Sequence, residues 1–118
     1  MRTIFFISIT IALAAFISED FLTGRWQTKP SDKGNVTSVV FKPDNTFEGF
    51  INRKPFTTGK YTLQDSVFTF TDNGCGGTEG VYKLMLQSDG DSLRFKCIRD
   101  TCTARKQGME RLIMGRVK

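Results

Sequence analysis

Apolar and polar residues alternate over short stretches along most of this chain, and turn residues separate these stretches. The alternation is clearest over residues 80–88 and again over residues 92–98. A Ser-Asp-Gly-Asp sequence joins the two, and its glycine favours a tight hairpin because glycine adopts positive φ at little steric cost. No long window has the period of a helix. The pattern therefore predicts successive β-strands joined by hairpins.

The expected strands cover most of the chain after its first 21 residues. They are residues 22–28, 36–42, 46–52, 56–63, 67–71, 80–88, 92–98 and 102–106, and residues 110–117 extend the series. Short strands with hairpin connections indicate an antiparallel meander. Closing the meander into a barrel removes its exposed edges. The expected fold class is therefore all-β, an antiparallel up-and-down β-barrel of about eight strands.

Large side chains on the expected inner faces form the predicted core. They are Trp26, Val39, Phe41, Phe47, Tyr61, Leu63, Phe68, Phe70, Tyr82, Leu84, Leu86, Leu93, Phe95 and Leu112. So many large aromatic side chains could fill a small barrel or line a cavity, and the sequence alone does not separate these outcomes. The predicted lining of a ligand cavity is Tyr61, Phe68, Phe70, Tyr82, Leu84 and Phe95.

The first 18 residues have the plan of a secretory signal peptide. A basic start at Arg2 precedes an apolar run, small residues follow, and Glu19 opens the polar chain. The run is shorter than the ~20 apolar residues that span a bilayer, so cleavage is favoured over a retained anchor. We therefore expect a signal peptide over residues 1–18, a domain over residues 19–118, secreted or periplasmic localisation, and no stable membrane span after cleavage.

Charge and composition exclude several functions. The net charge is +5, and basic residues are concentrated near the C-terminus. Acidic residues are interspersed among them, which is typical of solvated strand faces, so no nucleic-acid partner is expected. The chain contains no histidine. Ser-His-Asp and Cys-His mechanisms and histidine-built zinc sites are therefore impossible within it. We expect no catalytic residues, no metal and no cofactor.

Four short motifs carry a family resemblance. The sequence Gly24-Arg25-Trp26 resembles the Gly-x-Trp signature of lipocalins. The second half is similar to small lipocalin-like proteins of Bacteroidetes-type bacteria, through Cys75 with Gly80-Val81-Tyr82, then Gly90-Asp91-Ser92-Leu93, then Asp100-Thr101-Cys102-Thr103-Ala104-Arg105. The resemblance covers residues 22–117. It implies an exported calycin-type barrel with small hydrophobic molecules as the ligand class. The helix that often packs on a lipocalin barrel is not evident near the C-terminus.

The resemblance also implies structural roles for Trp26 and Arg105. In lipocalins a basic residue late in the chain covers the tryptophan of the first strand, and a guanidinium stacks well on an indole. Arg105 matches the motif position best, with Arg111 and Arg116 as alternatives. We expect Trp26 to close one end of the barrel and Arg105 to cap it.

Three cysteines in an exported chain suggest one disulfide and one free thiol. In the chain-entropy model a Cys97–Cys102 bridge gives ~2 kcal/mol, and a Cys75–Cys102 bridge gives roughly 3.5 kcal/mol. This larger gain, the resemblance and the position of Cys97 among core residues favour Cys75–Cys102, although all three pairings are possible.

The leading hypothesis is a secreted, non-catalytic lipocalin-like protein that binds a small hydrophobic molecule. The alternative is a protein-interaction or inhibitor module with a filled barrel, which uses its loops or basic C-terminal strands. The interior distinguishes them. An apolar cavity of at least ~300 Å³ supports the first hypothesis, and a filled interior supports the second.

Overall fold

A computed structural model describes residues 19–118, and the predicted signal peptide lies outside the described residues. The elements in chain order are α1 (Glu19–Leu22), β1 (Gly24–Thr28), β2 (Thr37–Phe41), β3 (Thr46–Ile51), β4 (Lys54–Gln64), β5 (Val67–Asp72), the 3-10 turn η1 (Cys75–Gly77), β6 (Gly80–Gln87), the 3-10 turn η2 (Ser88–Gly90), β7 (Ser92–Arg99), α2 (Thr103–Arg111) and β8 (Ile113–Arg116).

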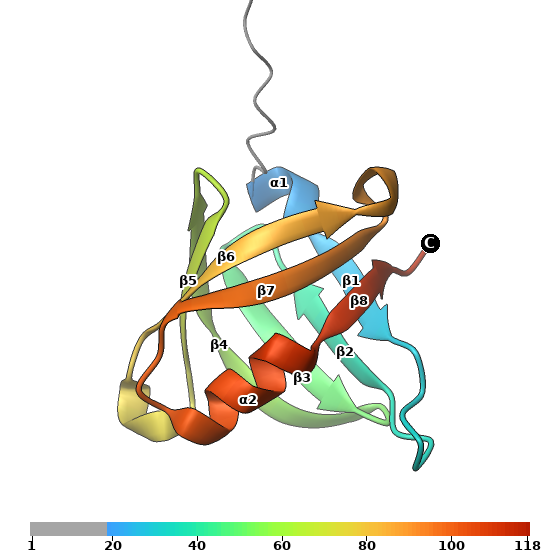
Figure 1. The fold of residues 1–118 in the computed structure, drawn as a ribbon, viewed down its shortest axis with the longest axis horizontal. Coiled ribbons are helices and arrows are strands. Elements are labelled where there is room, and N and C mark those ends of the chain that lie inside the picture. Colours follow the sequence, from blue (N-terminus) through green and yellow to red (C-terminus); the bar gives the residue numbers. More distant parts are fainter. Residues whose placement is uncertain (1–18) are drawn as a thin grey trace, which may run out of the picture.

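The eight strands form a closed antiparallel barrel (Figure 1). Each strand pairs with its neighbours in the sequence, and β1 pairs with β8 to close the ring. Trp26, for example, lies opposite Val39 of β2 on one side and Arg116 of β8 on the other. Closure gives both edges of the meander a partner. The predicted up-and-down barrel is confirmed.

The turn between β3 and β4 is tighter than the sequence predicts. A break is predicted over residues 53–55, whereas β4 already begins at Lys54 and includes Pro55. Asn52 and Arg53 make the turn, both with positive φ (51° and 71°). The β3–β4 pairing shifts register beside Pro55, and a sheet tolerates proline where its ladder is irregular because proline has no N–H to donate.

The predicted strand over residues 102–106 is wrong, because these residues open helix α2. The prediction that no helix lies near the C-terminus is wrong for the same reason. Most residues of α2 are polar, and none of them is fully buried. A helix without an apolar stripe leaves no periodic signal in the sequence. The final strand, β8, is four residues long and therefore shorter than the predicted residues 110–117.

The core is mainly aromatic and fills the barrel. Eleven of the predicted core side chains are buried, and the other three, Val39, Leu86 and Leu112, are partly buried against them. Leu22 and Met114 are also fully buried, which the predicted core omits. Phe68 lies near the centre, with its ring centroid 5.2–5.8 Å from those of Phe41, Tyr61, Phe70 and Phe95. Rings at these separations attract one another beyond the burial of their area.

Trp26 is buried beneath α1, and Arg116 covers it in place of the predicted Arg105. Trp26 is fully buried and donates its indole N–H to the carbonyl of Leu22 (2.9 Å). The Arg116 guanidinium lies 4.3 Å from the Trp26 ring centroid and donates to the carbonyls of Phe21 and Thr23. Strand register explains the correction, because residue 116 is the direct partner of Trp26 across the β1–β8 pair.

Helix α2 covers the place where β7 and β8 separate. These two strands pair only through residues 92–94 and 113–115, and α2 lies against β7 beyond that point (Figure 1). The helix therefore completes the wall of the barrel on this side. Over the described chain, residues 19–118, there is no helix with the length and apolar character to cross a membrane.

Candidate functional site

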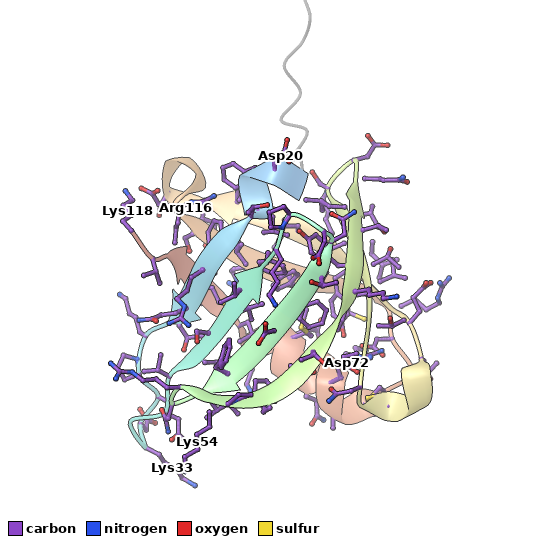
Figure 2. All side chains as sticks on the ribbon, turned by 180° about the vertical axis from the view of Figure 1, so that it is seen from behind. Asp20, Lys33, Lys54, Asp72, Arg116 and Lys118 are labelled. Atoms are coloured by element: carbon purple, nitrogen blue, oxygen red, sulfur yellow. A yellow bond between two sulfur atoms is a disulfide. The ribbon has the colours of Figure 1, made fainter. Side chains whose placement is uncertain are left out.

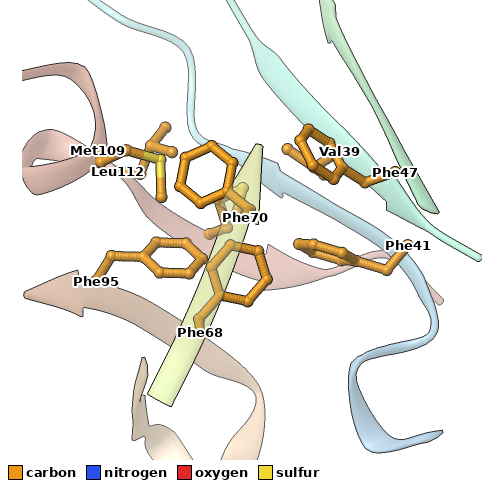
Figure 3. A pocket seen from close by; sticks show the side chains of 9 residues that line it. Val39, Phe41, Phe47, Phe68, Phe70, Phe95, Met109 and Leu112 are labelled. Carbon is orange, nitrogen blue, oxygen red and sulfur yellow. The ribbon is translucent and has the colours of Figure 1, made fainter. Parts of the chain in front are cut away.

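A small apolar cavity lies inside the barrel beneath α2 (Figure 3). Its volume is about 40 Å³. Its lining comprises Val39, Phe41, Phe47, Phe68, Phe70, Phe95, Met109, Leu112 and Met114. Aromatic rings from β2, β3, β5 and β7 face one another across it, and Met109 and Leu112 approach from the helix side (Figure 3). The space can hold only a few atoms.

The six residues predicted to line a ligand cavity divide into two groups. Phe68, Phe70 and Phe95 line the cavity. Tyr61, Tyr82 and Leu84 are buried in the core but do not belong to the lining. Whether any of the six contacts a ligand stays a prediction.

The cavity is far smaller than a typical ligand pocket. Sites for drug-sized molecules occupy ~300–1,000 Å³ and bury most of the ligand. The space beneath α2 is about 40 Å³. A larger apolar guest would have to displace Met109 and Leu112, both of which are only partly buried.

A closed polar cluster lies where β5, β6 and the start of α2 meet. Arg105 donates to both carboxylate oxygens of Asp100, through Nε (2.8 Å) and Nη2 (2.9 Å). It also donates to the carboxylate of Asp72 (3.3 Å) and the carbonyl of Thr78 (2.8 Å). Its guanidinium lies 4.9 Å from the centre of the Phe70 ring. Paired, fork-like hydrogen bonds of this kind are among the strongest in proteins.

The Asp100 carboxylate accepts two further hydrogen bonds, from the Tyr82 hydroxyl (2.5 Å) and the Cys102 N–H (2.9 Å). Burial alone would raise the pKa of Asp100, but hydrogen bonds from Arg105, Tyr82 and Cys102 outweigh it and lower the pKa to about 2. Burial, and then the bond to Asp100, raises the pKa of Tyr82 well above its usual value. The hydrogen bonds that Arg105 itself donates to Asp100 raise the pKa of Arg105. These groups therefore remain in their usual ionisation states near neutral pH.

This cluster explains the motif spacing in the second half of the chain. The Asp100 carboxylate accepts hydrogen bonds from both the Cys102 N–H and the Arg105 side chain. This shared acceptor accounts for the short spacing of the three residues in the sequence. Tyr82 reaches the same carboxylate, and a side chain at Gly80 would crowd it, since an added Cβ would lie 3.0 Å from an Asp100 oxygen. The predicted Cys75–Cys102 disulfide is confirmed and fastens η1 to the start of α2 beside the cluster. Cys97 is free and partly buried.

Sequence reasoning missed six residues of the cavity lining. Four of them, Val39, Phe41, Phe47 and Leu112, belong to the predicted core, whereas Met109 and Met114 belong to neither prediction. Met109 lies on the unpredicted helix, so no strand pattern could place it. Met114 lies two residues after Leu112 in a segment predicted as a strand. Because alternate residues of a strand share a face, this spacing could have placed Met114 in the core beside Leu112. Both methionines fill space next to aromatic rings, as flexible thioethers often do.

Comparisons with models of known families, with curated proteins and with solved structures found no match. The class of the protein therefore rests on its architecture, a closed barrel of eight antiparallel strands consistent with a lipocalin-like or calycin fold. This fold is compatible with a binding protein.

Proposed function

We propose that this chain is an exported, non-catalytic, lipocalin-like binding module whose interior serves as its folding core and whose outer surface recognises a protein partner. The observation that carries the proposal is the filled interior, with about 40 Å³ left among nine apolar side chains. The disulfide is in keeping with an oxidising compartment. Membership of the Bacteroidetes-type family, a signal peptide over residues 1–18 and secreted or periplasmic localisation are parts of the same proposal.

The outer face of β6–β7 is the surface proposed to meet the partner. Lys83 of β6 lies directly opposite Lys96 of β7, and both are exposed. Like charges in such a cross-strand pair destabilise a sheet. Neither lysine forms an ion pair with a carboxylate of the described chain. A partner with an acidic surface would relieve this repulsion.

Neighbouring side chains give the same face a mixed cationic and apolar character. Arg94 follows the same alternation as Lys96, and its buried Nε has no hydrogen-bond partner among residues 19–118. Ile113 lies opposite Arg94 across the β7–β8 pair and is 49% exposed. Ile98 is 56% exposed at the end of β7. Arginine beside exposed apolar groups is common where protein interfaces form.

Exchanging Lys96 for glutamate tests this surface. The Lys96→Glu chain should be more stable than wild type by up to about 1 kcal/mol, because an opposite-charge pair replaces a like-charge pair. The variant should also fail to bind the proposed acidic partner, because the new carboxylate repels it. Wild-type and variant proteins would be immobilised, exposed to the exported proteins of the source cells, and the captured proteins quantified by mass spectrometry.

The matched control is Lys60→Glu, which makes the same charge change on an exposed lysine of β4. The proposal predicts an acidic protein that Lys96→Glu loses at least about tenfold and that Lys60→Glu retains. If both variants capture the same proteins as wild type, β6–β7 is not the recognition surface.

A second candidate function is binding of a small hydrophobic molecule beneath α2. It is favoured by the wholly apolar cavity lining and by a covering helix with no fully buried residue. A fluorescent apolar probe, N-phenyl-1-naphthylamine, distinguishes the two functions. The filled-barrel proposal predicts no saturable binding by wild type and binding by Phe68→Ala, which opens a cavity. Wild-type binding that Leu112→Trp abolishes would establish the second candidate instead.

A further inference from the structure

A polar recess lies on the outer surface of β1–β3, on the side of the barrel that Figure 2 presents to the viewer. Its volume is about 360 Å³. Its lining comprises Arg25, Gln27, Val36, Ser38, Asn52 and Arg53. Two connections meet beside it, the β1–β2 loop that carries Lys33 and the β3–β4 turn that precedes Lys54 (Figure 2). Unlike the cavity beneath α2, this recess has the volume of a small-molecule site.

The two guanidinium groups are the only charged groups in the lining, and neither is neutralised. No ion pair or hydrogen bond to a carboxylate forms at Arg25 or Arg53 within the described chain. Glu48 lies in the same row of the sheet as Arg25 but two strands away, and it pairs with Lys42. Two unneutralised arginines in one recess create a positive potential that attracts an anion.

Hydrogen bonds hold the recess in shape. Asn52 donates its backbone N–H to the carbonyl of Val36 (2.9 Å), and its side-chain oxygen accepts from the Val36 N–H (2.9 Å). Its side-chain amide also donates to Asn35 (2.8 Å). The Arg25 guanidinium lies 5.6 Å from the centre of the Phe50 ring. The turn is thus tied to the loop, and Arg25 is supported from one side, so an anion would meet partly pre-organised donors.

The backbone at Arg53 has a conformation that favours glycine. Its φ is 71°, in the left-handed region where a non-glycine residue costs roughly 1 kcal/mol. Glycine is the preferred residue at this second position of a two-residue hairpin turn. The turn between β4 and β5 has the same geometry with Ser66 (φ 67°), so the conformation does not by itself mark a site. At residue 53, however, the turn carries an arginine that lines the recess together with Arg25.

We propose that this recess binds a small polar anion whose phosphate or carboxylate group lies between Arg25 and Arg53. Arginine's planar fork suits both oxyanions, because it can donate two parallel hydrogen bonds to either. Gln27, Ser38 and Asn52 supply polar groups for the body of the ligand. Val36 is the single apolar residue of the lining, so a lipid-like body is disfavoured. The site is independent of the proposed partner surface on β6–β7, which belongs to other strands.

Nuclear magnetic resonance titration of the protein at constant ionic strength tests the site. The probes are inorganic phosphate and glucose 6-phosphate for the phosphate class, and citrate and gluconate for the carboxylate class. The expected result is saturable shifts of the Val36, Ser38, Asn52 and Arg53 amides and of the Arg25 Nε–H signal with one class. Arg25→Gln should weaken that binding at least about tenfold, as expected for loss of hydrogen bonds to a charged group.

Arg53→Gly separates ligand binding from folding. It removes the guanidinium but places the preferred residue in the turn, so stability should stay the same or rise while binding weakens at least about tenfold. Ser66→Gly is the matched control for the turn, and Lys60→Gln, on an exposed lysine of β4, is the control for loss of one positive charge. Both should bind the probe as wild type does.

The proposal is overturned if no probe shifts the recess amides, or if Arg25→Gln and Arg53→Gly bind as tightly as wild type. It is equally overturned if Lys60→Gln weakens binding as much as they do, because the effect would then be one of net charge. None of these results bears on the filled-barrel proposal, which depends on the apolar probe and on Lys96→Glu.

Discussion

At the scale of single residues, two arginines from the C-terminal part of the chain take different structural roles. Arg116 covers Trp26 and binds carbonyls at α1. Arg105 binds Asp100 and Asp72 within the polar cluster and lies over Phe70. Local sequence could suggest that an arginine stacks on Trp26. The choice between candidates depended on strand register, which joins positions 26 and 116 from opposite ends of the domain.

Substituting Arg116 should therefore change the environment of Trp26, and substituting Arg105 should not. Trp26 is the single tryptophan of the chain, so its fluorescence reports on this site alone. Arg116→Gln should shift the emission maximum to longer wavelength and destabilise the fold by about 1–2 kcal/mol, since it removes a cation–π contact and two hydrogen bonds. Emission spectra and urea unfolding measure both effects. The same spectral shift in Arg105→Gln would contradict this assignment.

Asp100 should make the protein sensitive to strong acid. Its pKa is about 2 in the folded state and 3.8 at its usual value, so the unfolded state binds the proton more tightly. The stabilisation is fully present above pH ~4 and is lost as the pH falls through about 2. The contribution is about 2 kcal/mol. Urea midpoints measured from pH 7 to pH 2 should fall across this window.

Asp100→Asn should remove that acid-dependent loss while lowering stability at pH 7 by about 2–3 kcal/mol, because Arg105 loses its main counter-charge. Asp32→Asn, on an exposed loop, serves as the control and should behave as wild type. An Asp100→Asn chain that keeps the wild-type fall in stability between pH 4 and pH 2 would show that another carboxylate is responsible.

At the scale of elements, the strands follow from local pattern and α2 does not. Each strand alternates between the core and solvent, and that alternation is visible in the sequence. α2 is mostly polar and contributes only Met109, with Leu112 just after its end, to the cavity lining. Its place is fixed by what surrounds its first turn, namely the Cys75–Cys102 disulfide and the Arg105–Asp100 pair. These are long-range or side-chain contacts, and the hydrophobic periodicity of a sequence does not predict such contacts.

Gly108 offers a way to strengthen α2. It lies within the helix, its φ is not positive, and an added Cβ would meet no atom within 4 Å. Gly108→Ala should therefore raise the free energy of unfolding by about 0.5–1 kcal/mol. Gly76→Ala is a matched contrast, because an added Cβ is equally free of contacts there but φ is 63°. Gly76→Ala should destabilise the fold by roughly 1 kcal/mol. Equal thermal shifts for the two variants would contradict this explanation.

At the scale of the whole molecule, the barrel closes through contacts between distant parts of the chain. β1 pairs with β8, and the disulfide joins two positions separated by 27 residues across β6 and β7. Cross-linking a chain in this way stabilises the fold mainly by restricting the unfolded state. The interior is filled by aromatic rings, so closure and core packing depend on each other.

Removing the disulfide should cost roughly 3.5 kcal/mol in the chain-entropy model. The double variant Cys75→Ser with Cys102→Ser should show this loss in urea unfolding, and reduction of the wild type should reproduce it. Cys97→Ser is the control for cysteine chemistry. Because Cys97 is partly buried against the core, it should cost far less and should leave the response to reductant unchanged. A wild type whose stability is indifferent to reductant would contradict the assigned bridge.

The sequence by itself determined the first seven strands, the barrel and most of the core. Alternation, turn chemistry and residue spacing are local properties, and a meander needs little more. Only the tertiary structure decided that residues 103–111 are helical, that Arg116 covers Trp26, that Arg25 and Arg53 share a recess, and that about 40 Å³ remains inside. Those outcomes depend on pairing and packing between residues far apart in the chain. The volume of the cavity depends on how all the core side chains pack together, so no single segment of the sequence can predict it.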